Sequence, residues 1–355
     1  MTIRAKAARV AFQSVTKAFG SVVAVNGVSF DVEPGTLVTL LGPSGCGKTT
    51  TLRMIAGLEM ATSGRILIGD QDVTQLPATD RDVSMVFQSY ALFPHMTVAE
   101  NVAYGLTMSG FAKNEVRERA EEGLRLVGLA GYGKRLPSEL SGGQQQRVAV
   151  ARALVLEPAV LLFDEPLSNL DAKLRRRVRG DIRELQQKLG LTSVYVTHDQ
   201  EEALAVSDRI IVMKNAEIAQ EGSPRDLYET PADDFVADFI GDANLVEAEI
   251  ASLEGGEALV RIGDVERRLP ARGLEPGAVK VAIRPEAIRI AHNGAGGAFE
   301  ANVLKATYLG SHMEYTLATS LGELFVIDSD IEQPAEAGDK VTVDLARRGV
   351  TLVRS

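Results

Sequence analysis

The strongest constraint on this chain of 355 residues is an octapeptide that fits the phosphate-binding pattern G-x-x-x-x-G-K-[ST]. Residues 36–41 before it form an apolar run typical of a buried strand, and residues 49–55 after it are predicted to be helical. Because strand, turn and helix follow in this order, a chance glycine-rich turn is the weaker interpretation. The octapeptide consists of Gly42, Pro43, Ser44, Gly45, Cys46, Gly47, Lys48 and Thr49.

The composition of this loop suits a polyphosphate. Glycines let successive backbone N–H groups face one anion, and the following helix directs the positive end of its dipole at the same point. Lys48 is predicted to hold the β- and γ-phosphates and to act in catalysis, and the Thr49 hydroxyl to coordinate Mg²⁺. We expect the octapeptide and Thr50 to bind the nucleotide. Cys46 is interpreted as filling the loop, because a redox role needs a resolving cysteine and the chain has no other.

A pair of acidic residues follows a second apolar run, residues 160–163. A strand that ends in Asp164 can deliver a carboxylate beside the phosphate-binding loop, where it can hold Mg²⁺. Glu165 follows at once and could orient and deprotonate an attacking water. An Asp-Glu pair alone is often a helix cap or a turn, and the loop upstream is what favours a catalytic interpretation.

A second glycine-rich segment comprises Leu140, Ser141, Gly142, Gly143 and Gln144. Ser141 suits the N-cap of a helix that continues to residue 154, and the two glycines leave backbone N–H groups open to an anion. The alternative is an ordinary glycine-rich helix start. The chain thus holds two predicted phosphate-binding helix termini, one at Lys48 and one at Ser141.

Residues 140–144 resemble the signature sequence of the ATP-binding-cassette (ABC) ATPases, which ordinary P-loop enzymes lack. The resemblance implies a homodimer in which two copies pack head to tail. Each ATP, with Mg²⁺, then lies between the phosphate-binding loop of one copy and the signature of the other. It also implies that residues 1–240 form a P-loop NTPase cassette, with a mixed α/β sheet core, an antiparallel β subdomain and a helical subdomain at about residues 90–155.

Further motifs match the family by their order. Gln88 matches the Q-loop glutamine, whose amide can touch Mg²⁺ or the attacking water, so the predicted Mg²⁺ ligands are Thr49, Gln88 and Asp164. His198 follows the predicted strand 193–196 and matches the switch histidine, which can donate to the γ-phosphate. Phe19 matches the aromatic residue that stacks on adenine; burial in a sheet core is its alternative. The D-loop, which crosses the dimer interface in the family, is matched by Ser168, Asn169, Leu170 and Asp171.

Periodicity gives the remaining elements. Residues 22–25 and 28–32 are strand-like around a predicted turn at Asn26-Gly27, and residues 98–127 have helical character. Beyond residue 240 short alternating segments predominate, at 280–283, 287–290, 340–345 and 350–353, with turn residues at 292–297. Residues 241–355 are therefore predicted to form a small all-β domain.

This β-rich tail carries a second resemblance. Residues 284–288 and 308–311 look like segments of the oligonucleotide-fold-like (OB-like) TOBE domain of importer ATPases, which can carry regulation. The tail is similar to those of the iron(III), polyamine, sulfate, phosphonate and sugar importers. The resemblance implies an ATPase that drives solute uptake, with iron(III), a polyamine or a phosphonate-like compound as cargo.

Nowhere do about 18 apolar residues run together, so a channel would come from other chains. The resemblance implies two transmembrane permease subunits, an extracytoplasmic solute-binding protein acting indirectly, and a cytoplasmic location on the inner face of the membrane. Residues 90–98 resemble the surface that receives permease helices; exposed Leu92, Phe93 and Met96 would suit such a groove, and burial in the helical subdomain is the alternative.

Two other functions are considered, an exporter ATPase and a cassette ATPase linked to nucleic acid in repair or translation. The β-rich tail disfavours the exporter. A formal net charge of −10 and the absence of zinc cysteines disfavour nucleic acid as a partner. A basic run after the D-loop is interpreted as the solvated face of a helix. It consists of Lys173, Arg175, Arg176, Arg177 and Arg179.

Overall fold

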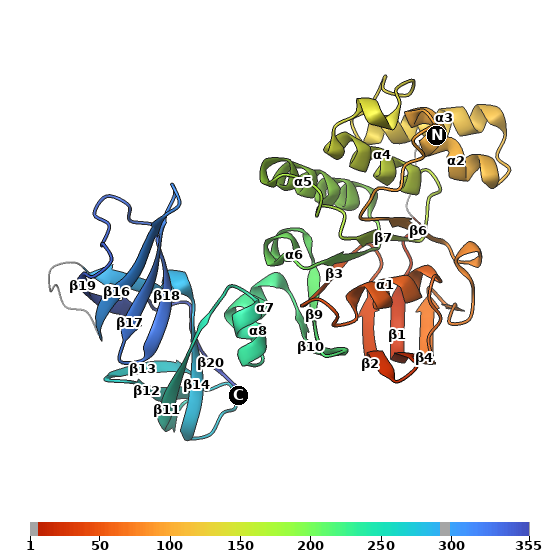
Figure 1. Ribbon diagram of the computed structural model, residues 1–355. Coiled ribbons are helices and arrows are strands. Elements are labelled where there is room, and N and C mark those ends of the chain that lie inside the picture. Colours follow the sequence, from red (N-terminus) through yellow and green to blue (C-terminus); the bar gives the residue numbers. More distant parts are fainter. Residues whose placement is uncertain (1–5, 292–298, 355) are drawn as a thin grey trace. The chain divides into compact units, whose positions relative to one another are not determined.

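The computed structural model describes residues 6–291 and 299–354. The chain forms two compact units that divide between Pro224 and Arg225, and each is described here by itself. Figure 1 labels their helices and strands. The sequence predicted a domain boundary at residue 240, sixteen residues further along the chain.

A six-stranded sheet forms the centre of the first unit, in the order β10-β9-β3-β8-β7-β6 within the described residues. All neighbours are parallel except β9 and β10, which pair antiparallel as a hairpin. Buried apolar residues dominate the inner strands, as expected for strands covered on both faces. The strands are β3 (Leu37–Leu41), β6 (Val83–Val86), β7 (Val160–Asp164), β8 (Ser193–Thr197), β9 (Arg209–Lys214) and β10 (Glu217–Gly222).

A four-stranded antiparallel sheet lies beside it, in the order β2-β1-β4-β5. Its strands are β1 (Val10–Phe19), β2 (Val22–Val32), β4 (Ser63–Ile68) and β5 (Gln71–Asp72). The predicted turn at Asn26-Gly27 is wrong, because β2 continues through both residues as an irregularity in its pairing with β1. Gly27 has a φ of +57°, and its N–H donates to Thr16 Oγ1 at 3.0 Å. A glycine in this left-handed conformation shifts the register without ending the strand.

Six helices complete the described part of the first unit. They are α1 (Lys48–Ala56), α2 (Val98–Met108), α3 (Lys113–Leu126), α4 (Gly142–Leu154), α5 (Ala172–Leu189) and α6 (Gln200–Val206), with short 3₁₀ turns at Ala78–Asp80 and Pro137–Glu139. The helical stretch predicted over residues 98–127 is two helices. Thr97 and Glu100 form a capping box at the start of α2, and Gly110, with a φ of +79°, lies in the break before α3.

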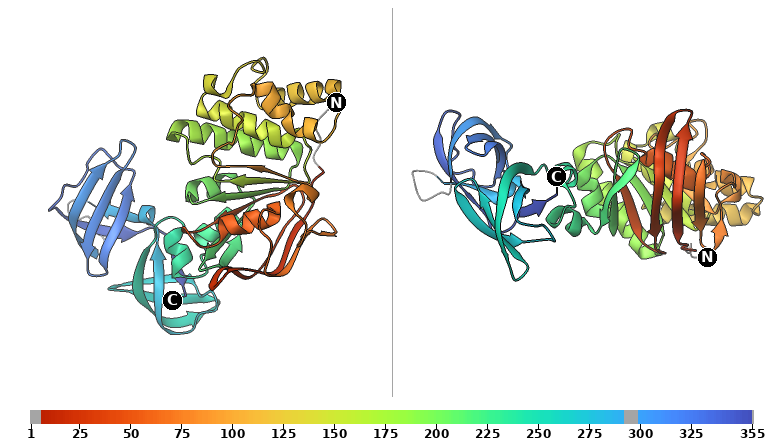
Figure 2. Two further views of the ribbon diagram at one scale, coloured as in Figure 1. Left: turned by 45° about the vertical axis from the view of Figure 1, so that its right-hand side comes forward. Right: turned by 90° about the horizontal axis from the view of Figure 1, so that it is seen from below.

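The two faces of the six-stranded sheet are buried by different partners. Alternate residues of β7 point to opposite sides. Leu161 and Phe163 pack with α2, α3, α4 and α5, whereas Val160 and Leu162 pack with α1 and the four-stranded sheet. Both arrangements can be followed in Figures 1 and 2, where α1 lies between the two sheets and α2, α3 and α4 lie together on the far side.

The second unit contains two five-stranded antiparallel sheets in its described residues, with orders β13-β12-β11-β14-β20 and β15-β19-β16-β17-β18. Inward-facing residues of both sheets share one core. The first sheet is built from β11 (Asn244–Glu254), β12 (Glu257–Ile262), β13 (Val265–Pro270), β14 (Gly277–Ile283) and β20 (Val350–Val353). The second is built from β15 (Ile288–Ala291), β16 (Phe299–Tyr308), β17 (Met313–Thr319), β18 (Gly322–Asp328) and β19 (Lys340–Leu345). The predicted turn at 292–297 lies outside the described residues.

Two short helices precede these strands, α7 (Pro224–Glu229) and α8 (Asp234–Phe239). The buried guanidinium of Arg284 donates to the main-chain oxygens of Tyr228, Ala237 and Ile240. This one side chain satisfies carbonyl groups at the ends of both helices. Most of α7 and all of α8 therefore belong to the β-rich unit.

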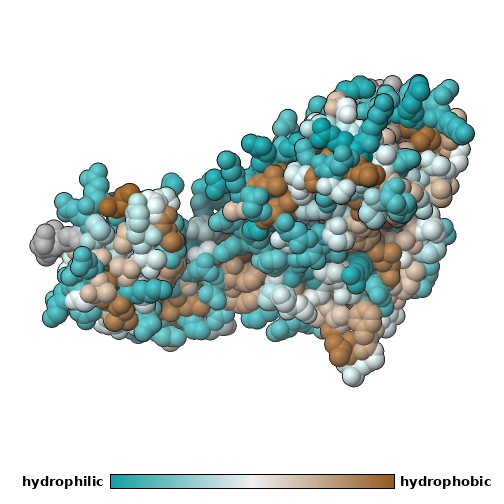
Figure 3. All heavy atoms as spheres, turned by 45° about the horizontal axis from the view of Figure 1, so that its top comes forward, coloured by the Kyte–Doolittle hydropathy of each residue, from teal (hydrophilic) through white to brown (hydrophobic). Residues whose placement is uncertain are grey.

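Among the described residues, no helix is both long enough and apolar enough to cross a membrane. Figure 3 shows that hydrophilic residues predominate on the face drawn there, with hydrophobic residues in small separate groups. Isolated apolar groups of this kind are ordinary on a folded protein.

Candidate functional site

The phosphate-binding loop lies between β3 and α1. Gly42, Gly45 and Gly47 have φ angles of +155°, +80° and +105°, which L-residues rarely adopt. A Cβ atom on Gly42 would lie 2.3 Å from the Met213 carbonyl oxygen, and one on Gly47 would lie 2.4 Å from that of Ala24. Both neighbours are main chain and cannot move aside, so these two positions accept only glycine.

Lys48 lies within the curve of this loop. Its side chain is buried, and Nζ donates to the carbonyl oxygens of Gly42 at 2.7 Å and Pro43 at 2.8 Å. The ammonium group is thus held beside the exposed residues Ser44 and Gly45, at the N-terminus of α1. Positive charge and unpaired helical N–H groups coincide there, as phosphate binding requires.

Cys46 is buried under the loop, with Sγ 3.8 Å from Lys48 Nζ. Its sulfur packs with the apolar core that contains α1. The position agrees with a residue that fills the loop from below.

Asp164 and Glu165 lie at the carboxyl end of β7. Asp164 is the last residue of that strand, and Glu165 has a φ of +44°, an uncommon conformation for a side chain of this size. The N–H of Glu165 donates to the Val196 carbonyl oxygen at 3.0 Å, which ties the turn to β8. Burial raises the pKa of the Asp164 carboxyl, the charge of Glu165 raises it further, and Arg53 opposes both. A divalent cation beside Asp164 would relieve this cost of burying its charge.

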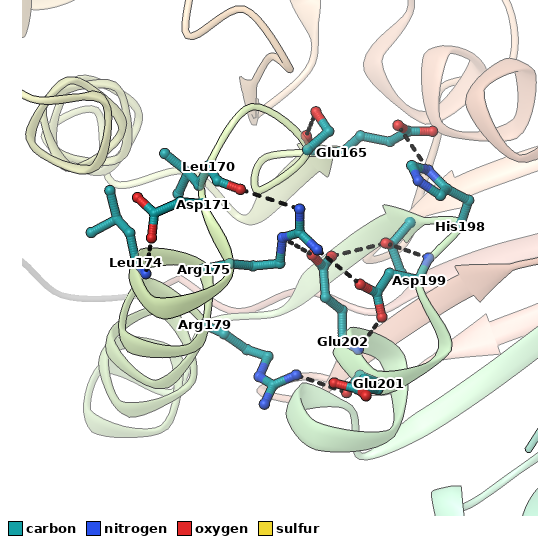
Figure 4. Close-up of polar contacts among 12 residues, drawn as sticks. Glu165, Leu170, Asp171, Leu174, Arg175, Arg179, His198, Asp199, Glu201 and Glu202 are labelled. Carbon is teal, nitrogen blue, oxygen red and sulfur yellow. Dashed lines mark hydrogen bonds and ion pairs between the residues drawn. The ribbon is translucent and has the colours of Figure 1, made fainter. Parts of the chain in front are cut away.

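His198 lies next to Glu165. It follows β8, the parallel neighbour of β7, and its Nδ1 lies 3.1 Å from Glu165 Oε2. The imidazole is 60% exposed, whereas the Glu165 carboxylate is only 22% exposed. Figure 4 shows the two side chains pointing toward each other. Both of them line a cavity of about 70 Å³. That cavity is lined by Glu165, Ser168, Arg175, Thr197, His198, Asp199 and Glu202.

The predicted Mg²⁺ ligands come from three segments: Thr49 from the first turn of α1, Gln88 from the loop after β6, and Asp164 from the end of β7. A hydroxyl, an amide oxygen and a carboxylate are the oxygen donors that Mg²⁺ prefers, with water and phosphate oxygens completing its coordination. β6 and β7 are parallel neighbours, so Gln88 and Asp164 both lie at the carboxyl-terminal edge of the sheet. The donor set therefore fits the ion.

The segment predicted as the D-loop, residues 168–171, is bonded to both sides of this site. Ser168 Oγ donates to the Glu165 carbonyl oxygen at 3.0 Å, and Asn169 Nδ2 donates to that of Gln88 at 3.0 Å. Asp171 caps α5 by accepting the Leu174 N–H at 2.9 Å. The segment therefore connects the loop of Gln88 with the carboxylate turn.

Ser141 is the N-cap residue of α4, as predicted, and is exposed. Its N–H donates to Gln144 Oε1 at 2.9 Å. The glycines also have a packing role that the sequence did not show. A Cβ on Gly143 would lie 2.8 Å from Leu174 Cδ1, and one on Gly142 would lie 3.2 Å from Leu170 Cδ2. Glycine lets the start of α4 approach the D-loop and α5.

Within one chain the two helix ends that are predicted to bind phosphate lie apart. α1 packs on one face of the six-stranded sheet, and α4 packs on the other, as Figure 1 shows. Lys48 and Ser141 therefore cannot face one nucleotide from the same side of the sheet. A second copy can bring the missing helix end, which agrees with a head-to-tail arrangement.

Phe19 ends β1 and is 48% exposed, with Lys17 Nζ 4.5 Å from its ring centroid. The ring is available for stacking, and burial in the sheet core is excluded. Leu92, Phe93 and Met96 are half-buried, which lies between the two alternatives of an exposed groove and a buried core. The Phe93 ring packs 4.7 Å from that of Tyr104, because the loop folds back on α2.

Arg175 was missed as a candidate site residue. Lys173, Arg176 and Arg177 are exposed, as a solvated face requires, but Arg175 is half-buried and faces the cavity. Its position is three residues before the buried Val178, on the inward face of α5. Helical spacing places Arg175 on the face of Val178, which is the one signal that the sequence offered, and the carboxylates packed on that face are seen only in the structure.

Comparisons with known proteins identify the family of this chain. Residues 25–168 match the family described as ABC transporter, and residues 281–353 match the TOBE domain. The Fe(3+) ions import ATP-binding protein FbpC of Rhizobium etli is 63% identical over 353 residues, 99% of this chain and 100% of that protein. The protein of the same name from Brucella abortus is 64% identical over 97% of each chain. That from Pasteurella multocida is 48% identical over 96% of this chain and 97% of its own length.

Solved structures show a similar fold. A dimeric structure of a post-hydrolysis state of the ATP-binding cassette MJ0796, bound to ADP and Pi, superimposes with a TM-score of 0.54 and 34% identity. It covers 61% of this chain and 99% of that one. The chain belongs to the ABC transporter family of ATP-binding proteins. Within that family it is the ATPase of an import system, with a C-terminal TOBE domain.

Proposed function

We propose that this protein hydrolyses ATP to ADP and phosphate at the interface of a head-to-tail homodimer, and so drives iron(III) uptake through two transmembrane permease subunits. The observation that carries the cargo is full-length identity of 63% to a protein named for iron(III) import. Because this identity extends over the full length of both chains, it favours iron(III) over the polyamine and phosphonate-like cargoes that the sequence also suggested. We place the protein on the cytoplasmic face of the membrane, since it would reach the permeases there.

The proposed chemistry combines residues from several segments of the site. Lys48 neutralises the β- and γ-phosphates and Phe19 stacks on adenine. Glu165 accepts a proton from the attacking water, and His198, 3.1 Å away, orients the Glu165 carboxylate and donates to the γ-phosphate. Bound through Thr49, Gln88 and Asp164, Mg²⁺ would supply positive charge to the phosphate oxygens.

The second copy completes the site in this proposal. The N-terminus of α4 would bring Ser141 and the glycine N–H groups to the γ-phosphate held by the facing chain. Contacts through Ser168, Asn169, Leu170 and Asp171 would join the two chains. Loss of the γ-phosphate removes the group that bridges them, so hydrolysis lets the dimer open and the permeases return.

A complementation assay tests the shared site. Lys48→Met removes the phosphate ligand of one chain, and Ser141→Arg places a bulky cation at the signature. Because Ser141 is exposed and extended, its own chain can accommodate the arginine. Each variant alone is expected to be inactive. Their mixture is expected to regain about a quarter of wild-type turnover, because half of the dimers are mixed and each has one intact site of two.

The mixture is measured against each variant alone at the same total concentration. A mixture as inactive as its components, although both variants fold and form mixed dimers, would refute the head-to-tail site.

Transport tests the cargo separately. The chain is reconstituted in proteoliposomes with candidate permeases and a candidate solute-binding protein from the same organism. Radiolabelled iron(III) uptake is expected to require ATP and to be lost in Lys48→Met. Uptake of spermidine or a phosphonate instead of iron(III) would refute the cargo and leave the ATPase intact.

A further inference from the structure

One arginine connects the D-loop to the segment that carries His198. Arg175 Nη2 donates to the Leu170 carbonyl oxygen at 3.2 Å, within the D-loop. Its Nη1 donates to Asp199 Oδ2 at 3.4 Å, and its Nε lies 3.7 Å from Glu202 Oε1. Figure 4 shows the guanidinium group between these three partners, at the start of both α5 and α6. The side chain thus joins two segments that lie far apart in the sequence.

The residues on both sides of His198 belong to the same network. Asp199 caps α6 by accepting the Glu202 N–H at 3.0 Å, and the N–H of Asp199 donates to Thr197 Oγ1 at 3.0 Å. Thr197 Oγ1 in turn donates to Glu202 Oε2 at 2.8 Å. The main chain of His198 is therefore held by its neighbours, while its exposed ring contacts Glu165.

The burial of Glu202 makes Arg175 difficult to replace. Glu202 is 3% exposed and also accepts from the buried Tyr195 hydroxyl at 3.2 Å. A buried carboxylate needs compensating partners, and Arg175 supplies the cation of this cluster. The planar guanidinium donates in several directions at once, which a lysine ammonium on a flexible stem does not reproduce.

We propose that Arg175 is a positioning residue that sets His198 beside Glu165 and transmits displacement of the D-loop to that histidine. The proposal rests on the proposed function in one respect, since a second copy is expected to press on the D-loop. Contact with the partner would then move Leu170, and through Arg175 the turn of His198. Hydrolysis at one site is thereby linked to assembly of the dimer.

The test compares Arg175→Met with Arg179→Met. Arg179 lies one turn further along α5 and donates to the Glu201 carbonyl oxygen at 3.1 Å, but it contacts no carboxylate of the network. Arg175→Met is expected to lower kcat roughly ten- to hundredfold, because a small displacement of a catalytic group costs that much. The KM for ATP should change by less than about twofold, since the nucleotide-binding residues are untouched. Arg179→Met should retain wild-type kcat.

A second readout does not depend on turnover. In histidine-labelled, nucleotide-free protein, the ring signal of His198 is assigned by its absence in His198→Gln. It is expected to shift in Arg175→Met and to stay in place in Arg179→Met. If the wild type proved not to hydrolyse ATP, the proposed function would fail. The shift of the His198 signal would still show whether Arg175 sets the position of that histidine.

A double variant separates an effect on the position of His198 from an effect on the stability of the folded protein. Arg175→Met leaves Glu202 buried without its cation and is expected to lower the melting temperature, whereas Arg175→Met with Glu202→Gln also removes the charge of Glu202. We expect the double variant to regain stability while its kcat stays low and its His198 signal stays shifted. Recovery of kcat together with stability would overturn the proposal, as would an unshifted His198 signal in the single variant.

Discussion

Replacement of Glu165 by glutamine tests the assigned general base. The amide has the same shape, can keep the 3.1 Å contact with His198, and fits a side chain that is 22% exposed. What is lost is proton acceptance, which contributes about 10²–10⁴-fold to rate, or about 3–5 kcal/mol in the barrier. Loss of the Glu165 charge also removes one of the causes that raise the pKa of Asp164. Asp164 therefore stays ionised more readily, and ATP with Mg²⁺ should bind at least as tightly.

The assay measures phosphate release and, by light scattering, the mass of the protein in ATP. Glu165→Gln is expected to lose at least about a hundredfold in kcat and to accumulate as an ATP-bound dimer. The matched control is Glu157→Gln, another glutamate with positive φ, at +52°, which lies 3.8 Å from Arg119 outside the site. Turnover of Glu165→Gln within about twofold of the control would refute the general-base role.

Two further predictions concern adenine and acid. Phe19→Ala should weaken ATP binding in calorimetry by about 1–3 kcal/mol, the usual contribution of base–aromatic stacking, while Phe19→Tyr should bind normally. An unchanged Kd in the alanine variant would remove Phe19 from the site. Asp208 accepts the Leu37 N–H at 2.8 Å and is paired with Arg183. Burial raises the pKa of Asp208, but these two partners outweigh burial and hold that pKa below its usual value. Its folded pKa is depressed, so its stabilising effect is present above about pH 4 and is lost as the pH falls through the folded value. Asp208→Asn should therefore lower the melting temperature more at pH 7 than at pH 3, and an equal difference at both values would contradict this assignment.

The candidate site was largely predictable because its requirements are local. Gly42, Gly47 and Lys48 stand in a fixed order along one turn, and the main-chain geometry of that turn excludes other residues. The end of an apolar strand likewise indicated Asp164 and Glu165. The structure adds their surroundings, above all the contact between Glu165 and His198, which lies 33 residues further along the chain.

Several features could not be derived from local pattern. Asn26-Gly27 is typical of a turn, but the pairing of β2 with β1 carries the strand through it. The sequence predicted that helices α7 and α8 belong to the cassette. In the structure Arg284, 44 residues beyond Ile240, donates to carbonyl groups at their ends and so joins them to the β-rich unit. Hydrogen bonds between segments decide both cases: Gly27 bonds to Thr16 in the neighbouring strand, and Arg284 bonds to Ile240.

The amino-acid sequence by itself determined the two glycine-rich helix starts, the carboxylate turn and the β-rich tail, because each depends on neighbouring residues. Only the tertiary structure decided that Arg175, one of five cations in a basic run, turns inward to two carboxylates while Arg176 and Arg177 face solvent. The physical reason is that successive residues of a helix point in different directions, and which direction is the interior depends on what packs there. In α5 that partner is the start of α6, which the chain reaches only after a further strand.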